Sequence, residues 1–494
     1  MLFNSQEFIY LFFPLVALVF FLIGARNVQL AAGWLGLASL FFYGWWSVQA
    51  LPLLLASITV NFALARLIAA SDGRRRSWLL TLGVTANLAL LGVFKYADFF
   101  LSNLNQGFAA LAWPEVPLLA WTLPIGISFY TFTQIAFLVD TTEGKVRESS
   151  FIHYLLFVTY FPHLIAGPVL HHAQMMPQFE RANTYRPAAQ NIVPGLIQFT
   201  IGLAKKLLIA DPLGAYADLT FGAMSTDMAI GRTEAWLALL AYALQIYFDF
   251  SGYSDMAIGL SRCLGITLPD NFNSPYRASN IIDFWRRWHI SLSTFLRDYL
   301  YFRLGGNRRG PARRHLNLAL TMILGGLWHG ASWNFALWGA LHGLYLIANH
   351  GWQSIVTRSG MRPPSSPVWR GAGQAITFVL VILAWVPFRS VDLDASIRYY
   401  QALFGPDGWP VGPFRGHELP FKLSTFYQTL VVGSLIAWTL PNSRHWSETA
   451  ANWVQGTGFL RRLPALLQGL GCGLLLVFCV SRLNRQSPFL YFQF

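Results

Sequence analysis

Charged residues are scarce in this chain. They make up 12% of its 494 residues, whereas 54% of the residues are hydrophobic and 16% are aromatic. A soluble globular chain carries roughly 25% charged residues, and the mean hydropathy of +0.43 is high. This scarcity excludes an ordinary water-soluble domain and indicates a protein that works inside a lipid bilayer.

Cysteine and several catalytic motifs are also scarce or absent. The three cysteines, Cys263, Cys472 and Cys479, stand in apolar sequence and are too few for a disulfide framework or a metal site. No phosphate-binding glycine loop, His-Glu-x-x-His or Gly-x-Ser-x-Gly motif occurs in a suitable context. These absences argue against nucleotide-driven transport and serine hydrolysis, and no bound metal is expected.

Long apolar runs are abundant instead. A membrane-spanning helix needs roughly 20 mostly apolar residues, and about a dozen helical segments follow that pattern. The sequence therefore predicts an all-α, multi-pass membrane protein in which residues 1–494 form one membrane domain, with the most motif-rich part at 121–350. The expected segments are Phe8–Ile23, Val28–Trp46, Pro52–Ala70, Trp78–Phe94, Val116–Val139, Phe151–Leu170, Ile192–Ala210, Ala235–Leu260, Leu316–Trp328, Trp333–Ala348, Ala375–Phe388, Phe426–Leu440 and Leu466–Val480.

The distribution of basic residues predicts the topology. The net charge of +13 is explained by cytoplasmic loops and anionic lipid, so nucleic acid is not an expected partner. The run Arg74–Arg76 indicates a cytoplasmic loop, and residues 97–115, which lack Lys and Arg, indicate an external loop. Lys145 and Arg147 then indicate a second cytoplasmic loop.

A third basic block breaks this simple alternation. It contains eight arginines between residues 286 and 314 and should also be cytoplasmic. One of the three preceding apolar segments must then enter and leave on the same side. Proline and glycine at 162–168, and Phe-Ser-Gly at 250–252, are candidate breaks. Because a broken helix at membrane depth is tolerated only inside protein or along a wet cavity, an internal cavity is predicted.

The most concentrated candidate site is the stretch 325–335, Gly-Gly-Leu-Trp-His-Gly-Ala-Ser-Trp-Asn-Phe. Gly326 and Gly330 form a small-xxx-small pair, which allows the close approach of another helix or a substrate chain. His329 can exchange a proton near neutral pH and is the candidate catalytic base. A structural role is about equally expected for a lone intramembrane histidine.

A second histidine favours the catalytic role over the structural one. The basic block repeats aromatic and aliphatic side chains at helical spacing, so that Trp285, Trp288 and His289 share the apolar face of an amphipathic helix. Arg286 and Arg297 lie on another face, where they could meet the phosphates of a substrate. A helix anchored to lipid headgroups explains the arginines equally well, but it does not explain a histidine on the apolar face.

Other polar side chains in apolar sequence are weaker candidates. Asp249 and Asp255 indicate the wall of a polar cavity, or partners of the histidines and arginines, although a packing role is more common. His163 and His342 are further candidates, whereas the pair at 171–172 is expected to be solvated at a membrane edge.

Taken together, these motifs resemble the membrane-bound O-acyltransferase family, in its bacterial branch of alginate O-acetylases and teichoic acid D-alanine transfer proteins. In that family the histidine of the Trp-His-Gly motif is associated with catalysis, which assigns this role to His329. His289 matches a second polar position that many relatives fill with Asn or Asp. The resemblance rests on Leu123–Phe132, Phe161–Pro168, Gln245–Asp255, Phe284–Tyr301, Leu304–Arg308 and Gly325–Gly330 in combination.

The resemblance implies about eleven transmembrane helices plus re-entrant or interfacial helices around a central tunnel. It implies a bacterial inner-membrane enzyme with no bound cofactor, which takes an acetyl group from a cytoplasmic thioester such as acetyl-coenzyme A. Periplasmic O-acetylation proteins would then place the group on an exopolysaccharide, with alginate as the first expectation. The residues expected to bind the donor or substrate are Trp285, Arg286, Trp288, Arg297, Trp328, Asn334, Asp249 and Asp255.

Three alternatives stay open. Cellulose or peptidoglycan could be the acceptor, because residues 167–172 and 488–494 differ from the alginate type. A transporter or flippase without covalent chemistry could use the same histidines and carboxylates to line a path, although no inverted repeat is visible. A membrane glycosyltransferase would need carboxylates for a metal or an acid/base pair, whereas histidines dominate here.

Overall fold

The structure, a computed structural model, describes residues 1–146, 150–165, 167–225, 230–360, 366–405, 422–455, 459–483 and 490, with the backbone alone at 455 and 459–465. Every regular element among these residues is helical. The chain divides into two compact units, one of residues 1–200, 254–269 and 446–486 and one of residues 201–253, 270–445 and 487–494. The expectation of a single membrane domain stays a prediction.

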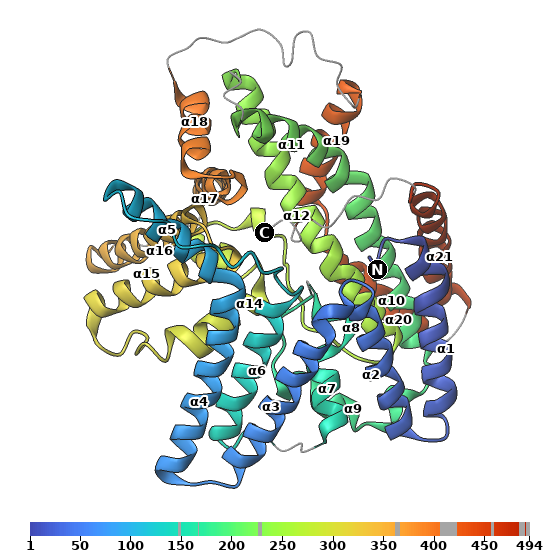
Figure 1. Ribbon diagram of the computed structural model, residues 1–494. Helices are drawn as coiled ribbons and strands as arrows, with labels where there is room; N and C mark the ends of the chain where they lie inside the picture. Colours follow the sequence, from blue (N-terminus) through green and yellow to red (C-terminus); the bar gives the residue numbers. More distant parts are fainter. Residues whose placement is uncertain are drawn as a thin grey trace. The chain divides into compact units, whose positions relative to one another are not determined.

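The first unit holds most of the N-terminal helices (Figure 1). Its helices begin where the sequence offers start signals: the Asn27 side chain accepts a hydrogen bond from the Leu30 amide at 3.0 Å to cap α2, and Pro52 stands in the first turn of α3. Helices α3, α4 and α6 pack against one another. The elements are η1 Phe8–Phe12, α1 Phe13–Gly24, α2 Val28–Gly44, η2 Val48–Ala50, α3 Leu51–Ala69, α4 Gly73–Leu91, η3 Gly92–Tyr96, α5 Ala97–Ala110, α6 Ile127–Thr142, α7 Phe151–Thr159, α8 Phe161–Leu164, α9 His172–Phe179, η4 Ala182–Tyr185, most of α10 Ala189–Ala204, most of α20 Ser443–Gln455, and α21 Phe459–Val480.

The second unit carries both histidine motifs. Its core is aromatic, with Trp338, Trp385 and Tyr399 almost completely buried. Helix α12 supplies residues to both units because its last turns, from Ser254 on, belong to the first. The elements of the second unit are η5 Lys205–Ala210, α11 Asp211–Ser225, α12 Arg232–Cys263, η6 Pro275–Arg277, α13 Ile281–Trp285, α14 Ile290–Phe295, η7 Leu296–Tyr301, α15 Gly310–His329, α16 Trp333–Arg358, α17 Pro367–Arg389, α18 Leu393–Phe404 and α19 Leu423–Thr439.

Several helices are suited to crossing a membrane. Within the described residues, four helical stretches are long and apolar enough: Val48–Ala69, Gly73–Ala110, Ala189–Ser225 and Pro367–Arg389. The bent pair Leu423–Thr439 and Ser443–Val454 makes a fifth candidate. The all-helical, multi-pass character is therefore as predicted, whereas the expected count of about eleven spans is not confirmed.

Two predicted boundaries near the N-terminus are wrong. Residues 97–110 form helix α5 rather than an external loop, because a π-helical turn, η3, carries α4 directly into α5. The expected helix Val116–Val139 begins only at Ile127. Pro124, which restricts the residue before it, and Gly126, with a φ of +73°, keep the preceding stretch out of helical conformation.

One of the two predicted helix breaks is present and the other is wrong. Helix α7 ends at Thr159 and is followed by the single turn α8, as Pro162 predicts. Helix α12, in contrast, runs unbroken through 250–252. Gly252 allows close packing there, since a Cβ atom on it would lie 2.7 Å from the carbonyl oxygen of Gly202.

Helices α15 and α16 cross in close backbone contact, as the small-residue pattern predicts (Figure 1). A Cβ atom on Gly326 would lie 2.1 Å from the carbonyl oxygen of Phe335, and one on Gly339 would lie 2.3 Å from that of Met322. Real Cβ atoms essentially never come this close, so both positions require glycine. The crossing lies one turn before His329 and fixes the end of α15.

Adding one methyl group at this crossing should destabilise the protein. We expect Gly326→Ala and Gly339→Ala each to lower the free energy of unfolding by about 1–3 kcal/mol, the usual effect of overpacking. The measurement is the thermal unfolding midpoint in detergent. The matched control is Gly351→Ala on α16, where a Cβ meets nothing within 4 Å, and its midpoint should stay level or rise. Equal midpoints for all three variants would contradict the close crossing.

Candidate active site

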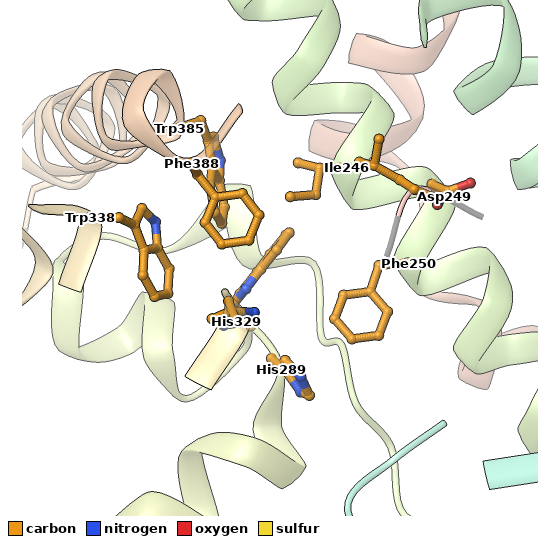
Figure 2. Close-up of a pocket in the computed structure, with 10 residues that line it drawn as sticks. Ile246, Asp249, Phe250, His289, His329, Trp338, Trp385 and Phe388 are labelled. Atoms are coloured by element: carbon orange, nitrogen blue, oxygen red, sulfur yellow. The ribbon is translucent and has the colours of Figure 1, made fainter. Parts of the chain in front are cut away.

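One pocket in the second unit collects side chains from separate stretches of the chain (Figure 2). The space between its lining residues, open solvent included, is about 350 Å³. Three lining residues, Asp249, His289 and His329, are titratable, and the other seven are apolar or aromatic. The lining residues are Ile246, Asp249, Phe250, Trp288, His289, His329, Trp338, Trp385, Phe388 and Leu490.

His329 is the last residue of α15 and is 6% exposed. The chain turns sharply after it, because Gly330 is extended and the ring of Phe335 occupies the space where a Cβ of Gly330 would lie. Aromatic rings pack around the imidazole, with ring centroids at 5.0 Å for Trp328, 5.1 Å for Phe388 and 5.2 Å for Trp338. The imidazole is thus held at the end of a helix inside an aromatic cage.

His289 reaches the same pocket from a break in the chain. The prediction of one amphipathic helix here is wrong, because α13 ends at Trp285 and α14 starts only at Ile290. His289 stands between them with φ 42° and ψ 54°, a left-handed conformation that is uncommon for histidine. Such strain costs about 1–3 kcal/mol and persists only where surrounding contacts impose it. The side chain is 1% exposed, so the expectation that it points inward is confirmed.

Asn271 fixes the proton on His289. Its Oδ1 lies 3.1 Å from His289 Nδ1 and also accepts hydrogen bonds from the Ser291 amide at 3.2 Å and the Ser291 hydroxyl at 2.8 Å. A backbone N–H can only donate, so this atom of Asn271 is the carbonyl oxygen and His289 Nδ1 must carry a proton. In the neutral ring, Nε2 then holds the lone pair. Within the described part of the chain, His289 Nε2 is buried without a hydrogen-bond partner.

Four other residues expected to bind the donor or substrate lie in or near the pocket. Asp249 and Trp288 line it. Trp328 packs against both histidines, with its ring centroid 6.4 Å from that of His289. Trp285 is buried behind Trp338, at 5.9 Å between ring centroids, and does not line the pocket.

The remaining four lie elsewhere. Arg286 and Arg297 are exposed, and the Arg297 guanidinium donates two hydrogen bonds to Asp298, at 2.7 and 3.1 Å. Asn334 donates to the Ser390 carbonyl oxygen at 2.8 Å and ties the start of α16 to the end of α17. Asp255 accepts a hydrogen bond from Gln198 at 3.3 Å within the first unit.

The other histidines considered from the sequence lie outside the pocket. In the first unit, His163 Nε2 lies 2.9 Å from the carbonyl oxygen of Phe157, a structural hydrogen bond. His342 in the second unit is fully buried against Trp338. The prediction of a solvated pair at 171–172 is wrong for His172, which is buried with Nδ1 3.0 Å from a carboxylate oxygen of Asp140. The partner that draws it inward lies on α6, far away in the sequence.

Comparison with known proteins identifies the family. The family profile of membrane-bound O-acyltransferases matches residues 99–386. The chain belongs to the membrane-bound O-acyltransferase family. It is 39% identical to a peptidoglycan O-acetyltransferase of Helicobacter pylori, over 100% of this chain and 98% of that protein. It is 37% identical to a probable alginate O-acetylase of Pseudomonas aeruginosa, over the whole of both chains. A teichoic acid D-alanyltransferase of Bacillus subtilis is 29% identical over 45% of this chain and 58% of its own length.

Two polar residues near the pocket of this O-acyltransferase are not identified from the sequence. Asn271 is separated by 18 residues from the histidine it orients, and no local pattern reveals this contact. Lys206 is 4% exposed and lies 2.6 Å from a carboxylate oxygen of the pocket residue Asp249. A signal for Lys206 did exist, because a lysine inside a predicted membrane segment is costly enough to demand a reason.

Removing the Asn271 carbonyl should impair this O-acyltransferase more than it impairs folding. We expect Asn271→Ala to lower acyl-transfer turnover about 10- to 100-fold, by analogy with the loss of a residue that orients a metal-binding histidine. The measurement is turnover alongside thermal stability. The control is Asn280→Ala, which removes the Asn280 cap from the Asp283 amide and should cost about 1 kcal/mol of stability with most turnover retained. Equal turnover in both variants would refute the orienting role.

Proposed function

We propose that this chain transfers an acetyl group from a cytoplasmic thioester, acetyl-coenzyme A, toward the periplasmic side of a bacterial inner membrane for O-acetylation of an exopolysaccharide of the alginate type. The observation that carries the proposal is the pocket in which His329 and His289 meet among apolar walls. Full-length similarity to a probable alginate O-acetylase supports the choice of acceptor.

The chemistry assigned to the pocket is acyl transfer with histidine as general base. An imidazole takes the proton of the acceptor hydroxyl while its oxygen forms a bond to the thioester carbonyl carbon. The carbon–sulfur bond then breaks, and the thiolate receives the proton from the imidazolium. We assign the base to His329. His289, whose ring orientation is fixed by Asn271, lines the same pocket and helps to orient the acceptor.

The donor requires a site for its phosphates outside the apolar pocket. Arg286, Arg308 and Arg309 are exposed, and guanidinium groups bind phosphate through paired hydrogen bonds. Arg287 and Arg297 already pair with Asp283 and Asp298. We therefore assign phosphate contacts to the first set rather than to Arg297.

The acceptor also involves other proteins. Partner proteins of the periplasm would take the acetyl group onward to the polymer, a role for further proteins that the full-length similarity to a probable alginate O-acetylase supports. The first experiment is release of free thiol from acetyl-coenzyme A by the purified chain in nanodiscs, with a polysaccharide acceptor and periplasmic partner proteins supplied.

Loss of either histidine should stop this reaction. We expect His329→Ala to lower thiol release by about 10²- to 10⁴-fold, the contribution of a general base, and His289→Ala to lower it less. The matched control is His163→Gln, a buried histidine of the first unit whose donor function glutamine keeps, and it should retain turnover. Thiol release that persists in His329→Ala would contradict the assignment of His329 as the base. No release by folded wild type with a competent acceptor would favour the transporter alternative.

Peptidoglycan is the second candidate acceptor. The specific observation in its favour is the 39% identity with the Helicobacter pylori peptidoglycan O-acetyltransferase over almost the whole of both chains. Ester-bound acetate on each polymer, measured in cells that express the wild type or His329→Ala, separates the two. Acetate lost from peptidoglycan alone would replace the alginate-type proposal.

A further inference from the structure

A cluster of three charges, two of them buried, lies behind the pocket. Lys206 Nζ lies 2.6 Å from Asp249 Oδ1 and 2.7 Å from Asp211 Oδ1, and the side chains of Lys206 and Asp249 are only 5% and 2% exposed. Taking ions out of water is costly, even when they are paired. The proposed acyl transfer does not use these groups, so the cluster needs another explanation.

The second carboxylate oxygen of Asp249 contacts a residue of the pocket wall. Asp249 Oδ2 accepts a hydrogen bond from the backbone amide of Leu490 at 2.9 Å. Leu490 lines the pocket and is 4% exposed. In Figure 2, Asp249 lies on α12 with its carboxylate turned away from His289 and His329. The carboxylate therefore serves the wall of the pocket rather than its reacting groups.

Lys206 and Asp211 keep the Asp249 carboxylate in place beside the Leu490 amide. Lys206 lies in the π-helical turn η5, a local irregularity that is frequent at functional sites. Asp211, in the first turn of α11, shares the Lys206 ammonium with Asp249. A charged acceptor makes a stronger hydrogen bond to a backbone N–H than a neutral one. The ion pair thus gives the Leu490 amide a fixed, charged anchor in an otherwise apolar place.

We propose that Leu490 is a specificity-determining residue that limits the acyl group to a short chain, and that Asp249, held by Lys206, is the positioning residue that keeps Leu490 in the pocket. This inference rests on the proposed acyl transfer. Leu490 and His329 line the same pocket, so a longer acyl chain held at the imidazole would meet the Leu490 side chain. One extra methylene against a packed wall changes discrimination by about 10- to 200-fold.

The activity test compares acetyl-, propionyl- and butyryl-coenzyme A with the full-length chain in nanodiscs. Leu490→Ala removes three carbon atoms, and a butyryl group brings two more than an acetyl group. We expect the butyryl-to-acetyl ratio of kcat/KM to rise at least about 10-fold in Leu490→Ala and to rise in Asp249→Asn as well. The control is Asp218→Asn, a carboxylate of the same unit that pairs with Arg389 at 2.7 Å and does not contact the pocket. It should leave the ratio unchanged.

A labelling test measures how accessible residue 490 is, and it does not depend on enzymatic activity. In a variant whose three native cysteines are replaced by serine, Leu490→Cys should react slowly with N-ethylmaleimide because the residue is buried, and adding Asp249→Asn should speed the reaction at least 10-fold. Fast labelling before Asp249 is changed, or an unchanged ratio in Leu490→Ala, overturns the inference. If the wild type releases no thiol from any thioester while residue 490 stays protected, the proposed function fails. The structural part of the inference, that Asp249 holds Leu490 in the pocket, then still stands. If Asp249→Asn does not fold, Leu490→Ala and Leu490→Cys still decide.

Discussion

The hydrogen bond between His289 and Asn271 is the contact on which the site depends. One carbonyl oxygen receives the histidine N–H together with the amide and hydroxyl of Ser291. This oxygen therefore fixes the orientation of the His289 ring and the position of its proton, and it also fixes the start of α14. In apolar surroundings such a polar network is stronger than in water, and an unpaired member is correspondingly costly. His329 is held differently, by the close crossing of α15 and α16 and by the aromatic rings around it.

The sequence supports the helical, membrane-bound character and both site histidines for one physical reason. Polar groups in apolar sequence are costly, so His289 and His329 stand out without any structure. Helix boundaries are less predictable, because the π-helical turn η3 and the bend before Ile127 depend on packing. Contacts between distant residues are least accessible. Asn271 with His289, and His172 with Asp140, pair residues that no periodicity connects.

The relatives of this chain separate its chemistry from its choice of acceptor. Proteins named for peptidoglycan and for alginate are similar to it at 39% and 37% identity, each over essentially the full length. A histidine pair in an apolar pocket is indifferent to which polymer finally carries the ester. In the proposed function, the acyl group is handled in the pocket lined by His289 and His329.

The left-handed backbone at residue 289 has a consequence for how the site could change. Asparagine and aspartate adopt this conformation more readily than histidine, because their short polar side chains tolerate it. An exchange of histidine for asparagine at 289 would thus relax the main chain while it removes the imidazole. The main-chain geometry at 289 therefore tolerates asparagine as well as histidine, and histidine is the residue that the surrounding contacts have to hold in place.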